Sequence, residues 1–174
     1  MKTKLFIIFI FCLVARLSKA QDLEDYLKGD QIFLTINSHN IKFNDIDRKS
    51  VIKLIGKPLK IKQEYSEEAD VMHVDYIYKG GTITFEKNDI AFLEITKPGW
   101  GFTFYKDNKL TPNFIVGSDA SSIKEFFPFS LLKKGENFIR ITIKTADNLG
   151  TESAVLFEIK AGKVKSISFF TDES

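Results

Sequence analysis

The side chains that most often carry chemistry are few in this chain of 174 residues, which has two histidines and one cysteine. His73 and Asp75 stand two positions apart in a β-rich stretch, so they share one face of a predicted strand. A carboxylate there could orient the imidazole as a general base. No nucleophile-elbow sequence supports such a site, and His39 and His73 do not suggest a zinc site with its three or four ligands. We interpret the pair as part of a solvated polar face.

Two further motifs resemble ligand sites only superficially. Glu67, Glu68 and Asp70 cluster in a predicted turn, but they lack the alternating acidic pattern with a central glycine that a calcium loop requires. The Gly80-Gly81 pair joins two predicted strands and opens no helix, so it does not form a phosphate-binding loop. The sequence therefore predicts no catalytic residues, no metal and no cofactor, and we expect a protein that is not an enzyme.

The first twenty residues have the layout of a secretory signal peptide. Lys2 and Lys4 form a basic start, residues 5–15 are uncharged and apolar, and Ser18 and Ala20 form a small-x-small cleavage site. The apolar run is too short for a membrane span, which needs about 20 residues. We predict cleavage after Ala20, and export to the periplasm or the extracellular space.

Removing residues 1–20 takes away four basic residues and no acidic ones, which leaves 21 basic and 23 acidic side chains and a formal charge of −2. The balance disfavours a dedicated nucleic-acid binder. Cys12, the only cysteine, is lost with the leader; it follows the large Phe11, so we predict no lipid anchor. The full sequence is 44% hydrophobic and is therefore too apolar to be disordered. Without a cysteine, the remaining chain must rely on core packing.

Turn signals and apolar periodicity divide the remaining chain into two similar series of elements. Each series has a short helix that ends at a proline, followed by four strands. In the first series the helix is predicted at residues 47–55 and the strands at 59–65, 71–78, 82–86 and 90–96. In the second series the helix is predicted at residues 120–127 and the strands at 129–133, 138–145, 154–160 and 164–170. Further strands are predicted at residues 32–36 and 100–105.

The two series have matching spacing, which indicates an internal repeat. Ile52 corresponds to Ile123, 71 positions later, and Pro58 to Pro128, 70 positions later. We therefore predict an α+β fold built from two helix-plus-four-strand antiparallel repeats. The boundaries are a signal peptide at residues 1–20, an N-terminal segment with repeat 1 at 21–99, and repeat 2 at 100–174.

The segment at residues 44–58 and its echo at residues 116–128 resemble the helical start of the tandem-repeat β-lactamase-inhibitor-protein fold. They are also similar to the small-protein-A repeat of outer-membrane lipoproteins. Gly56-Lys57-Pro58 matches the Gly-x-Pro stop after the helix, and Gly117-Ser118 matches the turn before it. The resemblance implies one curved antiparallel sheet with both helices on its convex side. It also implies a protein-binding concave face and no catalytic machinery.

Several predicted strands are apolar on both faces, although a sheet covered on one side should be polar on the other. Aromatic and arginine side chains dominate protein-binding hot spots, so we predict that such residues form an interaction patch. The candidate contacts are Tyr76, Tyr78, Phe92, Trp100, Tyr105, Phe138 and Arg140. In the competing interpretation, Trp100, Phe102 and Phe104 form a core stripe on an edge strand.

The sequence thus favours an exported, non-enzymatic module that binds a protein partner through one sheet face, as an inhibitor, an immunity protein or an envelope scaffold. The alternative is a carrier whose curved sheet holds a small apolar ligand or lipid. A third possibility, a hydrolase without a recognisable motif, would need a cleft where titratable groups with perturbed pKa values converge. The sequence names no partner.

Overall fold

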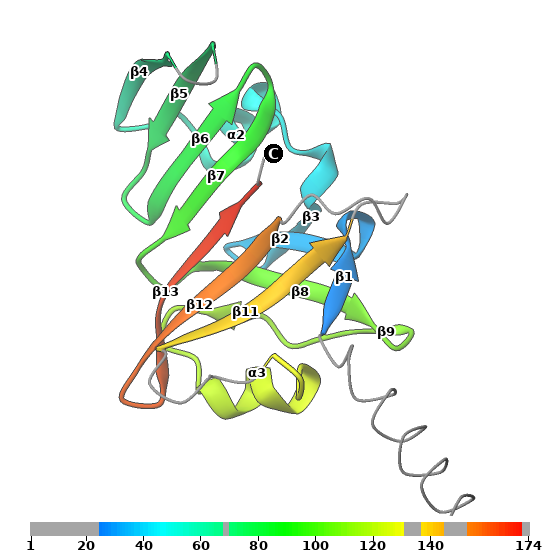
Figure 1. The fold of residues 1–174 in the computed structure, drawn as a ribbon. Coiled ribbons are helices and arrows are strands. Elements are labelled where there is room, and N and C mark those ends of the chain that lie inside the picture. Colours follow the sequence, from blue (N-terminus) through cyan, green and yellow to red (C-terminus); the bar gives the residue numbers. More distant parts are fainter. Residues whose placement is uncertain (1–24, 68–69, 131–136, 145–152, 172–174) are drawn as a thin grey trace, which may run out of the picture.

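The computed structural model describes residues 25–67, 70–130, 137–144 and 153–171. The predicted signal peptide lies outside these residues. Within them the chain forms thirteen strands and two α-helices, and the strands make two sheets (Figure 1). The large sheet has the order β1 (Tyr26–Lys28), β11 (Phe138–Lys144), β12 (Ala154–Lys160), β13 (Lys163–Phe170), β7 (Asp89–Ile95), β6 (Gly81–Glu86), β5 (Val71–Ile77) and β4 (Lys60–Ser66).

The smaller sheet has the order β10 (Phe114–Ile115), β8 (Trp100–Lys106), β2 (Ile32–Ile36) and β3 (His39–Lys42), and β9 (Lys109–Leu110) also pairs with β8. The helices are α2 (Arg48–Ile55) and α3 (Ala120–Phe126), with 3-10 turns η1 (Gly29–Gln31) and η2 (Phe43–Asp45). Figure 1 shows the smaller sheet and α2 behind the large sheet.

The predicted α+β fold, two helix-plus-four-strand repeats in one sheet, is therefore wrong: the described chain is mostly β and has two sheets. The error arose at the two further predicted strands, residues 32–36 and 100–105, which were not counted among the four strands of either series. β2 pairs with β8, with Phe33 opposite Thr103, and the two strands form the middle of the second sheet. Strand periodicity identifies a buried face but not the sheet to which a strand belongs, because pairing partners lie far apart in sequence.

The local elements were more predictable than the architecture. The helices predicted at residues 47–55 and 120–127 are confirmed as α2 and α3, and most predicted strands are present. Phe129 and Ser130, the start of one predicted strand, form a turn instead, and residues 131–133 lie outside the described part.

Both helices begin at an aspartate. The Asp47 carboxylate accepts a hydrogen bond from the Ser50 backbone N–H at 2.6 Å, and Asp119 accepts one from Ser121 N–H at 2.9 Å. The Ser50 backbone bond lowers the pKa of Asp47, and the Ser121 hydroxyl, together with the Ser121 N–H, lowers the pKa of Asp119, because such bonds stabilise the charged form. Gly56 then ends α2 with φ of +91°, a conformation that favours glycine.

The hydrophobic core lies between the two sheets. Phe85, Leu93 and Phe157 from the large sheet are fully buried, as are Phe102 and Phe104 from the smaller one. The ring centroids of Phe104 and Phe157 are 6.4 Å apart, so the sheets are in direct aromatic contact. This contact buries only the inner face of the large sheet, and its other face carries no further described element in Figure 1.

Candidate functional site

Three of the seven predicted contact residues lie in the core. Tyr76 and Tyr78 are 8% exposed and Trp100 is 6% exposed. The Tyr78 ring packs 5.5 Å from Trp100, and burial raises the pKa of Tyr78 to about 12, with a smaller contribution from nearby Tyr76. For Trp100, Phe102 and Phe104, the competing interpretation is right about burial in the core. It is wrong about the edge strand, because β8 lies between β10 and β2. These three side chains are not presented to a partner in this conformation.

A fourth predicted residue, Tyr105, lies away from the others. It is 40% exposed on β8 of the smaller sheet, where it stands opposite Leu110 of β9. Phe104, the preceding residue of β8, is buried in the core, and successive side chains of a strand point to opposite faces. Tyr105 therefore belongs to the outside of the smaller sheet.

The remaining three, Phe92, Phe138 and Arg140, lie on the outer face of the large sheet. Phe92 of β7 stands directly opposite Phe170 of β13, and Arg140 of β11 stands opposite Leu156 of β12. Directly opposed residues project to the same face of a sheet. We call the patch made by Phe92, Phe138, Arg140, Leu156 and Phe170 the open face.

The open face combines exposed apolar surface with a positioned cation. Phe92 is 38% exposed and Phe138 is 48% exposed, while Phe170 is partly covered. The guanidinium of Arg140 lies 5.5 Å from the centre of the Phe170 ring, within the range of a cation–π contact. This places an arginine beside aromatic side chains on a surface made of rigid, paired strands.

Polar side chains beside the open face satisfy one another. The Glu158 carboxylate accepts hydrogen bonds from Lys165 Nζ at 2.8 Å and Ser166 Oγ at 2.6 Å, and these bonds lower its pKa. Glu158 thus stays ionised and paired. Beside the patch, these three polar groups are already hydrogen-bonded to one another.

His73 and Asp75 also lie on this side of the sheet. Asp75 of β5 accepts a hydrogen bond from Thr84 Oγ1 of β6 at 2.7 Å. Thr84 stands opposite Phe92 of β7, so these residues lie on the same face of the sheet as the open face. Among the residues that the structure describes, no group of three or more His, Cys, Asp or Glu side chains is placed to hold a metal ion. The interpretation of His73 and Asp75 as part of a polar face agrees with this placement.

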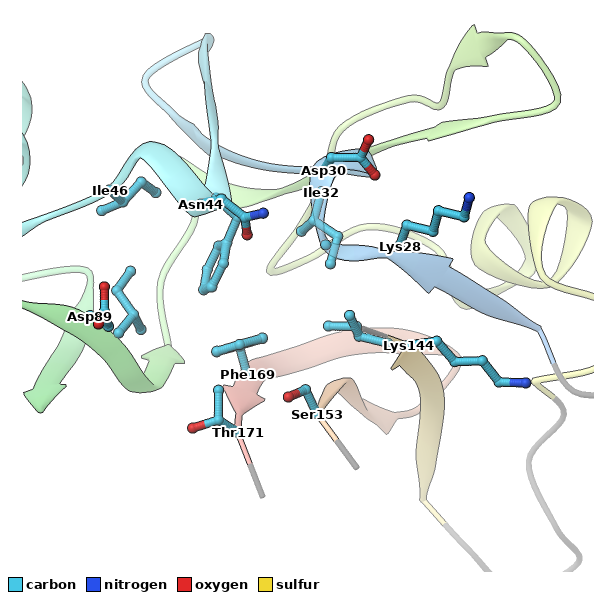
Figure 2. Close-up of a pocket in the computed structure, with 14 residues that line it drawn as sticks. Lys28, Asp30, Ile32, Asn44, Ile46, Asp89, Lys144, Ser153, Phe169 and Thr171 are labelled. Atoms are coloured by element: carbon cyan, nitrogen blue, oxygen red, sulfur yellow. The ribbon is translucent and has the colours of Figure 1, made fainter. Parts of the chain in front are cut away.

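A second feature, absent from the sequence interpretation, is a cavity of about 660 Å³ at one end of the core (Figure 2). We call it the end cavity. Its lining is mainly apolar and comes from both sheets and the turns between them: Ile32, Phe43, Ile46, Ile90, Ile143 and Phe169. A volume of this size is typical of small-molecule pockets, roughly 300–1,000 Å³.

The rim of the end cavity is polar. Lys28 and Lys144, which are paired residues of β1 and β11, extend their amino groups to the same side, away from its centre (Figure 2). Asn44 points inward from η2, and Asp30 and Asp89 lie at opposite sides. Since this lining gathers segments from across the chain, no local motif could have revealed it.

None of the helices in the described part of the chain has the length and apolarity of a transmembrane span. Comparison with protein families, with curated proteins and with solved structures finds no match for this chain. The resemblance to the tandem-repeat inhibitor fold therefore stays a prediction, and the functional argument depends on the geometry alone.

Proposed function

We propose that this chain is an exported, non-enzymatic binding protein that engages another protein through the open face. The observation that carries the proposal is the arrangement of Phe92, Phe138, Phe170 and Arg140 on an uncovered side of the large sheet. Aromatic residues and arginine are enriched at binding hot spots, where burial of apolar area supplies most of the energy.

The rigidity of the surface supports the proposal. β7, β13, β12 and β11 are adjacent, hydrogen-bonded strands, and their opposite face is packed into the core. A surface held by such strands loses little conformational entropy on binding, which leaves more of the contact energy for affinity. The proposed role includes inhibition, immunity or scaffolding of an envelope protein.

The test is affinity capture from an envelope extract with the wild-type chain, with the double variant Phe92→Ala/Phe138→Ala, and with Arg140→Ala. We expect a specific partner to be retained by the wild type and lost from the double variant. Loss of Arg140 should weaken retention by roughly tenfold or more, the size of a hot-spot effect.

Tyr105→Ala is a matched control, because Tyr105 has a similar exposure to Phe92 but lies on the smaller sheet. Circular dichroism would verify that every variant remains folded. Equal capture by the wild type and the double variant would sink the proposal, and so would loss of capture in Tyr105→Ala alone.

The end cavity supports a second candidate function, the carriage of a small apolar molecule. Its apolar lining and its volume of about 660 Å³ are the specific observation in its favour. Native mass spectrometry of the purified protein would detect a co-purified apolar molecule. Ile90→Trp should fill the cavity and abolish that binding, whereas Leu110→Trp, at an exposed position, should not. A protein that neither carries such a molecule nor binds a fluorescent fatty acid would exclude this function.

A further inference from the structure

The large sheet ends at β4, whose whole length is exposed except for a half-buried Ser66. The edge of β4 that faces away from β5 pairs with no other described strand. An uncovered edge of seven residues is a template for another strand, and proteins usually shorten or cover such edges. We propose that the strand that completes this edge is β4 of a second copy of this chain, in an antiparallel, twofold arrangement centred on Gln63.

The hydrogen-bonding direction along β4 can be worked out from the neighbouring hairpin. Tyr78 N–H donates to Gly81 O at 2.9 Å, so the main-chain groups of Tyr78 and of alternate residues before it point toward β6. The intervening residues, such as Asp75, therefore point toward β4. Asp75 stands opposite Lys62, so the main-chain groups of Lys62 are paired with β5.

The residues that alternate with Lys62 must then direct their N–H and C=O groups outward. These are Ile61, Gln63 and Tyr65. A twofold axis at Gln63 places Gln63 opposite its own copy, and Ile61 opposite Tyr65 of the other copy. All of these residues direct their N–H and C=O groups away from β5. Each opposed pair can therefore exchange two main-chain hydrogen bonds.

The charges of β4 select this register. The same axis brings Lys62 opposite Glu64 of the other copy, and the twofold symmetry makes this pair twice. Moving the axis by one residue would place Lys62 opposite Lys62, or Glu64 opposite Glu64. Like charges directly opposed are destabilising and opposite charges are favourable, so of these three registers the one centred on Gln63 is preferred, because it opposes no like charges.

The apolar side chains of β4 give the same arrangement a second source of stability. Ile61 stands opposite buried Tyr76, and Tyr65 opposite Met72, so they belong to the inner face of the sheet. They are nevertheless about half exposed: Ile61 51%, Tyr65 52% and Met72 46%. Pairing would set Ile61 of each copy against Tyr65 of the other and extend the apolar row across the junction.

A standard protein interface buries roughly 800 Å² on each partner, and a single pair of strands buries less than that. We therefore expect a dimer that dissociates on dilution. Sedimentation equilibrium of the purified protein over roughly 1 μM to 1 mM covers this range of association. The expected result is a reversible monomer–dimer equilibrium. A wild-type chain that stays monomeric throughout would overturn the proposal.

A charge-exchange experiment tests the register itself. Lys62→Glu and Glu64→Lys should each weaken self-association by roughly tenfold or more, because every contact across the axis then joins like charges. The two variant chains carry opposite charges at these positions, so an equimolar mixture should form a mixed dimer. The double variant Lys62→Glu/Glu64→Lys should recover self-association. Self-association that is unchanged in the single variants, or a mixture that stays monomeric, would contradict the register.

A backbone variant tests the use of the edge. Gln63→Pro removes an outward N–H while leaving the pairing of β4 with β5 intact, since proline is tolerated on the solvent side of an edge strand. We expect it to abolish dimers, and Gln63→Ala to retain them. The melting temperature at low protein concentration would show that both variants fold. Dimers of undiminished strength in a folded Gln63→Pro chain would rule out pairing through β4.

Discussion

The two edges of the large sheet are built in contrasting ways. At one edge, β1 is three residues long, and the side chain of its central residue, Leu27, is 2% exposed. At the other edge, β4 is seven residues long and its apolar side chains, such as Ile61, are about half exposed. A three-residue edge strand offers few main-chain groups to another strand, whereas a seven-residue edge strand offers many.

The β1 edge is held by a buried ion pair. The Asp25 carboxylate, 4% exposed, accepts a hydrogen bond from Lys106 Nζ at 2.7 Å and two more from the N–H groups of Phe129 and Ser130. Lys106 also lies 4.5 Å from the centre of the Phe127 ring. The start of the described chain is thus fastened to β8 and to the end of α3. The outer edge of β4, in contrast, pairs with no other strand among the described residues.

The largest expected effect is at this ion pair. Asp25→Ala leaves Lys106 partly buried without its counter-charge and leaves the two N–H groups unpaired, so we expect a loss of about 3–5 kcal/mol in the free energy of unfolding. Urea unfolding measures it. Asp30→Ala, at an exposed carboxylate in η1, is the control and should change stability by no more than about 0.5 kcal/mol. Similar losses in both variants would show that the edge is not held in this way.

The next effect compares apolar residues of the two edges. Leu27→Ala should cost about 2–5 kcal/mol, because it opens a cavity in the core. Ile61→Ala should change the stability of the monomer by no more than about 0.5 kcal/mol. Both would be measured by urea unfolding at low protein concentration. A large loss at Ile61 in the monomer would mean that the inner face of β4 is covered, and the contrast between the edges would fail.

A smaller effect concerns pH and the connection that leads into β4. The Tyr78 hydroxyl donates to Gly56 O at 3.2 Å, and its pKa of about 12 lies above the usual value of 10. Folding therefore favours the protonated phenol. This contribution is complete below pH 10 and is lost as the pH rises toward 12. Urea midpoints across that interval should fall less steeply for Tyr78→Phe than for the wild type, and equal slopes would contradict this account.

The smallest effect is expected at Tyr65 of β4. Its hydroxyl donates a hydrogen bond to Asp70, which raises the pKa of Tyr65, but the group is exposed to solvent. Solvent screens such a contact, so Tyr65→Phe should leave the thermal midpoint of the monomer unchanged within error. A clear loss of stability would show that this turn fastens the β4 edge, which would weaken the contrast with β1.

The candidate site was only partly predictable. Phe92 was selected from a strand with two apolar faces, and Phe138 and Arg140 were selected because aromatic and arginine side chains dominate hot spots; the structure brings all three to one surface. Tyr76 and Tyr78 were selected by the same rule, yet they are buried. Alternation along a strand separates two faces, but it does not say which face another layer will cover.

The sequence by itself determined the local structure. Asp47 and Asp119 cap the two helices, and Gly56 ends α2, because these effects depend on residues within one turn of the chain. The turn at Gly80-Gly81 is also local, because its hydrogen bond runs from Tyr78 N–H to Gly81 O, three residues later. Gly81 also has a tertiary role, since a Cβ there would lie 2.0 Å from Glu94 O on the neighbouring strand.

Only the tertiary structure decided the division into two sheets, the burial of Tyr76 and Trp100, the end cavity and the bare edge at β4. Each depends on segments that meet from distant parts of the chain, as when β2 pairs with β8 or β7 with β13. Such pairings are selected by the burial available to the whole chain, and local propensity carries little information about them. The aromatic content specified a large apolar surface; the packing of the layers decided which part of it remained open.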